Sequence, residues 1–157
     1  MSTFEIFKII QTSSIGRAIG GLDHLFCAAI ELAHILGMLL VLSSVILVSL
    51  RLLGLGLHNQ SLTRLYRATS GFIWAGLGLL VISGLLIFIP AATSYYPNEF
   101  FWIKFILLGL TLLIHLTVFR NISLADMPNS IASKLTALLS LSLWFGVAFA
   151  GRFIGFF

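Results

Sequence analysis

Apolar residues are arranged along this chain in four long stretches separated by short polar segments. The stretches run over residues 22–53, 70–90, 99–120 and 131–153. Each can form a helix that crosses a hydrocarbon core about 30 Å thick, which takes roughly 20 residues. The continuous runs lack the alternation of a barrel strand, and backbone groups in lipid must bond within their own segment. The pattern predicts an all-α integral membrane bundle of four antiparallel transmembrane helices, in one domain over residues 1–157.

The polar segments agree with this division. All three prolines, Pro90, Pro97 and Pro128, fall between the apolar stretches, where a missing N–H costs little. Asn98 and Ser130 precede the third and fourth stretches and are residue types that cap helix N-termini. The connections are short, which favours an up-down-up-down bundle.

Residues 1–20 show a different periodicity. Four apolar residues share one side of a helix: Phe4, Ile6, Phe7 and Ile10. Glu5 and Lys8 lie opposite them. This amphipathic pattern predicts a short N-terminal helix that lies in the membrane interface.

Composition and charge support a membrane protein. The chain is 59% hydrophobic and 9% charged, whereas a soluble domain carries roughly 25% charged residues. The net charge of +4 comes from basic residues that flank apolar stretches. We therefore expect the lipid bilayer, and no nucleic acid, as the partner of these cations. The single cysteine, Cys27, excludes an intramolecular disulfide.

Four crossings place both termini on one side of the membrane, here called side A. The opposite side, side B, carries five Lys and Arg residues against four on side A; the five are Arg51, Arg64, Arg67, Arg120 and Lys134. The positive-inside rule therefore predicts that side B is cytoplasmic and that both termini lie outside.

Unusual polar residues gather on one face of the first stretch. At about 100° per residue, six of them fall within an arc of about 100°: Asp23, His24, Cys27, Glu31, His34 and Met38. All six types can bind a metal, accept a proton or hydrogen-bond a cofactor. Ionisable residues inside a membrane are costly and indicate function by default.

Three interpretations of this face remain open. In the first, Glu31 forms a structural ion pair with Lys104 or Arg152, and His34 hydrogen-bonds within that cluster. In the second, His34 ligates the iron of haem b or a copper ion, and Glu31 orients its imidazole. In the third, Glu31 and His34 relay protons to a lipid-soluble quinone. A copper site would draw its further ligands from the same face: Met38, Cys27 and His24.

Helix geometry limits the haem interpretation. His24 and His34 are ten residues apart on one helix, or about 15 Å, so they cannot share an iron. His115 is a second candidate for cofactor binding, or else a hydrogen-bonded core histidine. Aligning the helices at Arg51 and Arg120 leaves about 18 Å between His34 and His115 in depth. A haem here would have a single histidine ligand or would borrow one from a partner chain.

The chain shows no catalytic motif. It has no Gly-rich phosphate loop, no Ser-His-Asp set and no large soluble portion, so we expect no catalytic residues and no enzyme activity of the chain alone. The leading functional hypothesis is a redox- or metal-associated membrane subunit. The alternatives are a structural or accessory subunit without a cofactor, acting with another membrane subunit or as a homo-oligomer, and a small-molecule transporter. The transporter lacks support from inverted repeats with broken helices.

Several elements resemble an uncharacterised bacterial inner-membrane family known as a domain of unknown function. They are the pair Glu31-x-x-His34 with Gly37, the run Arg51-Leu-Leu-Gly-Leu, Trp74-Ala-Gly, Ser-Gly-Leu-Leu at 83–86, Asn98 with Lys104, and Trp144 with Gly151-Arg152. The sequence departs from that family at Ser49, where an acidic residue is expected. The resemblance implies four transmembrane helices in a bacterial inner membrane and no known activity. In such a membrane, termini on the outer side, as the positive-inside rule predicts, would be periplasmic. A looser architectural likeness is to CopD-type copper-resistance proteins and b-type cytochrome membrane subunits, a weak basis for function.

Overall fold

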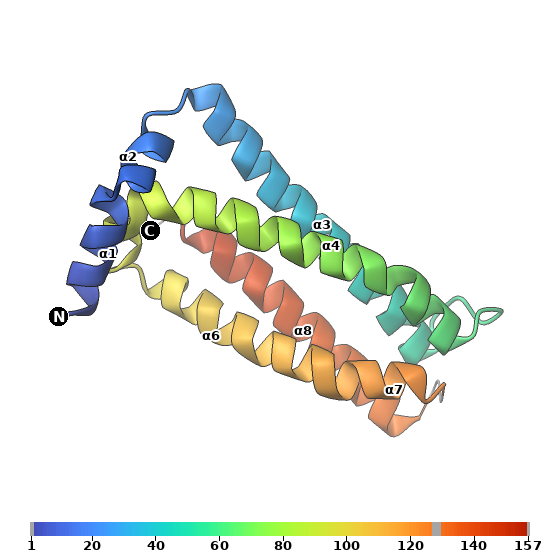
Figure 1. Cartoon of the computed structure of the whole chain (residues 1–157). Helices are drawn as coiled ribbons and strands as arrows, with labels where there is room; N and C mark the ends of the chain where they lie inside the picture. The colour runs from blue at the N-terminus through green and yellow to red at the C-terminus, as the bar shows by residue number, and fades with distance from the viewer. Residues whose placement is uncertain (1, 127–129, 157) are drawn as a thin grey trace.

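A computed structural model describes residues 2–126 and 130–156 of the chain, so Pro128 lies outside the described residues. Four of its helical segments are long and apolar enough to cross a membrane: His24–Leu53, Leu62–Tyr95, Glu99–Leu124 and Ile131–Phe153. The first is helix α3 and the last is α8. The prediction of an all-α bundle with four membrane-spanning helices is confirmed. The two termini lie at the same end of the bundle (Figure 1).

The second and third spanning segments are each built from several elements. α4 (Leu62–Phe88) continues through the 3₁₀ turn η1 (Ile89–Ala91) into α5 (Ala92–Tyr95). α6 (Glu99–Ile114) continues through a π-helical turn, η2 (His115–Phe119), into α7 (Arg120–Leu124). A π turn interrupts the regular i→i−4 hydrogen bonds of a helix and often occurs at functional sites.

Side-chain caps set where the helices begin. The Asn98 side chain accepts a hydrogen bond from the Phe101 N–H, and the Ser130 hydroxyl accepts one from the Ser133 N–H, which confirms both predicted caps. α4 begins at Leu62, earlier than the predicted residue 70. Asp126 accepts the Leu62 N–H at 2.7 Å and satisfies a donor at the start of that helix.

Two short helices, α1 (Thr3–Thr12) and α2 (Ser14–Gly20), lie across the side-A end of the bundle (Figure 1). Phe7 is the buried residue of α1 and packs on Phe88 and Phe101 with ring centroids 5.3 and 6.1 Å apart. Gln11 accepts hydrogen bonds from both the N–H and the hydroxyl of Thr93, at 2.8 and 2.6 Å. The predicted amphipathic segment is therefore fastened to the turn that ends the second span.

α3 and α4 cross with their backbones in contact. A Cβ atom on Gly37 would lie 2.9 Å from the Gly76 carbonyl oxygen, and one on Gly76 would lie 2.7 Å from the Gly37 carbonyl oxygen. Lipid offers no hydrophobic drive for helix association, so close approach at small residues is a main source of packing energy. This crossing fixes how α3 and α4 face one another.

A small buried cluster of Phe7, Ala92 and Phe101 lies at side A, whereas the larger buried core lies on the side-B side of this crossing. It joins α3, α4, η2 and α8 through Val45, Leu52, Tyr66, Phe119 and Trp144. Toward side A, α3 diverges from α8 (Figure 1). From His24 to Leu36, Ile30 is the one buried residue of α3. The polar face predicted on α3 therefore lies in the open half of the bundle.

Candidate functional site

His34 is half-buried on α3 and is fixed by α4. Its Nδ1 atom lies 2.9 Å from Ser83 Oγ, and the Ser83 hydroxyl donates its hydrogen to the Leu79 carbonyl. A hydroxyl has one hydrogen, so Ser83 Oγ accepts from the Nδ1–H of His34. A neutral imidazole that carries its proton on Nδ1 keeps a lone pair on Nε2. That lone pair can bind a metal or accept a proton.

Gly84 makes room for the imidazole ring. A Cβ atom at this position would lie 3.3 Å from His34 Cε1. The edge of the ring therefore rests against the α4 backbone beside Ser83. Ser83 and Gly84 together set the orientation and the tautomer of the His34 ring.

Lys104 of α6 lies within electrostatic range of His34. Its stem and ammonium lie against Gly151 of α8, where a Cβ atom would be 3.4 Å from Nζ. Within residues 2–126 and 130–156, Lys104 has no acidic partner within 4 Å. A lysine inside a membrane span without a carboxylate partner is unusual and marks a candidate functional position.

The predicted ion pairs of Glu31 with Lys104 or Arg152 are not formed in the part of the chain that the structure describes. Glu31 is exposed on α3, and the Arg152 guanidinium lies over the Phe156 ring at 5.1 Å. The physical reason is the divergence of α3 toward side A (Figure 1), because Lys104 and Arg152 belong to α6 and α8. Helical periodicity placed Glu31 and His34 on one face but did not predict this divergence.

The residues proposed for a copper site are not gathered at one point. His24 is bonded to Asp23 at 2.7 Å, and both side chains are exposed. Cys27 is exposed, whereas Met38 packs against the buried core. Among the described residues no group of three or more His, Cys, Asp or Glu side chains is placed to hold a metal ion. A shared helix face spreads these ligands along the membrane normal, so they do not converge on one ion.

His115 lies in a different environment from His34. It begins the π turn η2, is 3% exposed, and stacks on Phe119 with centroids 5.0 Å apart. The Trp144 ring meets it edge-on at 6.2 Å. In the described structure, His115 Nδ1 and Trp144 Nε1 are both buried without a hydrogen-bond partner. His115 therefore belongs to the aromatic packing of η2 and α8, and His34 to the contact between α3 and α4.

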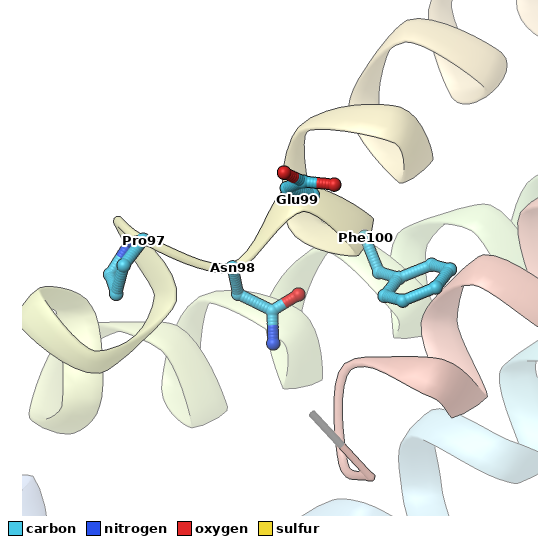
Figure 2. Close-up of a pocket in the computed structure, with 4 residues that line it drawn as sticks. All are labelled: Pro97, Asn98, Glu99 and Phe100. Carbon is cyan, nitrogen blue, oxygen red and sulfur yellow. The ribbon is translucent and has the colours of Figure 1, made fainter.

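Two pockets lie near side A. The first, about 280 Å³, surrounds the start of α6 at Pro97, Asn98, Glu99 and Phe100. Figure 2 shows Asn98 and Glu99 pointing to opposite sides of the backbone. Asn98 is occupied by its cap and by a bond from Nδ2 to the Ile154 carbonyl at 3.3 Å. The polar groups that line this first pocket therefore do not converge on one point. The second pocket, about 220 Å³, is lined by Glu31.

The sequence analysis named Ser83, Gly84 and Gly151 only as parts of the family resemblance and did not predict that the first two contact His34 or that Gly151 contacts Lys104. Ser83 and Gly84 are adjacent in an otherwise apolar stretch of the second span. A hydroxyl beside a small residue is a signal that could have suggested a polar partner for His34, although Ser70 and Gly71 show the same pattern in that span. Gly151 gave no comparable signal.

One family model matches residues 4–157. The chain belongs to DUF6644, a family of unknown function. No curated protein and no solved structure matches this DUF6644 chain, so the looser likeness to CopD-type proteins and cytochrome subunits has no support. Membership adds no activity, and function must be argued from the His34 environment.

Proposed function

We propose that this chain is a small redox-associated membrane subunit that binds haem b through Nε2 of His34. The observation that carries the proposal is the bond from His34 Nδ1 to Ser83, whose own hydrogen goes to Leu79. Histidines that ligate a metal almost always donate their other ring N–H to a fixed partner, which sets the tautomer and the ring orientation. A single histidine is also a common axial ligand of haem iron.

The charge beside His34 favours haem over copper. A copper ion at His34 would lie within electrostatic range of Lys104, and the protonated form of that lysine would repel it. Haem b carries two propionate groups, and a carboxylate is the natural partner of an unpaired ammonium. Haem also needs fewer protein ligands than copper, which agrees with the absence of a ligand cluster among the described residues.

Reconstitution tests the proposal directly. Full-length protein purified in detergent, supplied with ferric haem and freed of excess, should show a Soret band with stoichiometric iron. Because the described chain offers one histidine at this point, the iron should keep an open coordination position. The reduced protein should then bind carbon monoxide and shift its Soret band. A folded preparation that remains colourless after reconstitution would refute the proposal.

The bond between His34 and Ser83 also supports a second candidate, an accessory subunit without a cofactor. In that case the hydrogen bond joins α3 to α4 and has no ligand to orient. Removing it would lower thermal stability and change no ligand measurement. In the haem proposal, by contrast, the open coordination position of the iron would accept a ligand from another subunit or from a second copy of this chain.

We further propose that side B is cytoplasmic and that both termini are periplasmic, in a bacterial inner membrane. Side B carries Arg51, Arg64, Arg67, Arg120 and Lys134. Alkaline phosphatase fused at residue 157 should be active in the periplasm, and a fluorescent protein fused there through the general secretion route should stay dark. Fusions truncated after residue 58 should give the reverse pattern. Active phosphatase at residue 58 would invert the topology.

A further inference from the structure

A partly open pocket lies beside Glu31 at side A. It measures about 220 Å³ and lies between α2, α3 and the turn where α4 meets η1. Three of its lining residues are polar, Cys27, Glu31 and Tyr95, and the others are apolar, including Ile19 and Pro90. Glu31 and Tyr95 come from different spans and lie close enough to interact electrostatically.

Hydrogen bonds hold the wall of this pocket in place. Gln11 binds both the N–H and the hydroxyl of Thr93 and so fastens the α1–α2 segment to α5. At the end of α2, a Cβ atom on Gly20 would lie 3.6 Å from the Pro90 Cβ, in ordinary contact. Ile19 is therefore positioned over the pocket by contacts on either side of it.

The pocket lies at a depth that a membrane-soluble ligand can reach. α1 and α2 cross the side-A end of the spans (Figure 1), where an amphipathic segment meets the boundary of headgroups and acyl chains. Next to Glu31 on α3, Leu32 and Ile35 are 57% and 56% exposed and face lipid. A ligand with an apolar tail can leave that tail among the acyl chains and insert its head.

The lining selects the chemistry of that head. Glu31 is an acceptor when ionised, Tyr95 can donate or accept, and no Lys or Arg lines the pocket. This set suits a head with O–H donors and disfavours an anionic one. The volume is below the range of roughly 300–1,000 Å³ that holds a drug-sized molecule. A single substituted ring is the appropriate size.

We infer that this pocket binds the headgroup of a lipid-soluble hydroquinone, with one ring hydroxyl donating to the Glu31 carboxylate and Tyr95 bonding the other. This inference rests on the proposed redox function. It adds to that function the class of lipid-soluble ligand that the subunit would bind. Binding does not require haem, since His34 does not line the pocket.

Cys27 provides the experiment, because it is the only cysteine of the chain and lines the pocket. Full-length protein in lipid nanodiscs is treated with a maleimide, with and without a decyl-substituted benzohydroquinone kept reduced. The bound headgroup should slow alkylation of Cys27 severalfold. Retention of the radiolabelled hydroquinone, corrected for empty nanodiscs, measures the same binding without relying on thiol reactivity.

Glu31→Gln should abolish protection and specific retention at the same hydroquinone concentration. The matched control is Glu99→Gln, an exposed side-A carboxylate outside this pocket, which should keep both. Absence of binding, or equal binding by Glu31→Gln, overturns the inference. Equal, Glu31-dependent protection by decylamine also overturns it, because the site would then select a cation.

The haem proposal and the hydroquinone inference fail separately. His34→Ala protein without haem should still bind the hydroquinone, because the pocket is intact in that variant. Hydroquinone binding in a chain that never takes up haem would leave the pocket assignment standing and remove the haem assignment. Haem uptake without hydroquinone binding would leave the haem assignment standing and remove the pocket assignment.

Discussion

Replacing His34 with alanine should abolish the Soret band of the reconstituted protein, whereas replacing His24 should leave it unchanged. His34 is the histidine whose ring is oriented by a partner on a second helix, through the 2.9 Å contact with Ser83 Oγ. His24 is exposed and bonded to its neighbour Asp23 at the start of α3. Absorbance spectra and iron content of the two variants, normalised to folded protein, measure the difference. A Soret band of equal intensity in His34→Ala would contradict the assignment.

Ser83 separates a ligand role of His34 from a purely structural one. Ser83→Ala removes the acceptor of the Nδ1–H and should weaken haem binding about 10- to 100-fold, the usual effect of losing a partner of a metal-bound histidine. Ser83→Thr retains the hydroxyl and should retain most of the affinity. If His34 only joins α3 to α4, both His34→Ala and Ser83→Ala would lower thermal stability and neither would change the spectrum of haem-treated protein.

The four spans could be predicted from the sequence because lipid imposes a strong and local rule. A backbone without water must hydrogen-bond within its own segment, so a long apolar run becomes a helix wherever it occurs. The start of α4 was misplaced because it depends on Ser61 and on Asp126, a residue 64 positions away from Leu62. The sequence becomes strongly apolar only near residue 70, so hydropathy does not mark the first turns of α4.

The candidate site was only half predictable. Periodicity alone placed Glu31 and His34 on the same face of the first helix. Their partners depend on how α3 is tilted, and tilt is set by the contact between Gly37 and Gly76. At this crossing His34 meets Ser83 of α4, while the divergence beyond it leaves Glu31 beside Tyr95 and away from Lys104. The sequence predicts how deep a residue lies along its own helix, but it does not predict which residue of another helix it contacts at that depth.

The π turn at His115 also escaped the sequence analysis. Residues 99–120 are one apolar stretch, and nothing in its composition distinguishes a regular helix from one that widens at His115–Phe119. Two features of the structure accompany the turn: His115 stacks on Phe119, and Phe119 packs against Tyr66 of α4. Tertiary packing of large rings, which hydropathy does not encode, therefore coincides with the change in helix type.

Gly76→Leu should cause a large loss of stability. A Cβ at Gly76 would lie 2.7 Å from the Gly37 carbonyl oxygen and 2.8 Å from Val41 Cγ2. The carbonyl belongs to a helix backbone and cannot rotate away, so α3 and α4 must separate. Overpacking in a core commonly costs about 1–3 kcal/mol, and a contact with backbone should reach at least the upper end of that range.

Gly78→Leu is the matched control, because a Cβ there meets nothing within 4 Å. Both variants exchange glycine for the same strong helix former, a gain of up to about 1 kcal/mol each, so their difference isolates the crossing. Unfolding in detergent should show a lower midpoint for Gly76→Leu and an equal or higher one for Gly78→Leu. Because Ser83 lies on the helix that is displaced, Gly76→Leu should also weaken haem binding. Equal midpoints for the two variants would mean that the contact between Gly37 and Gly76 does not hold α3 against α4.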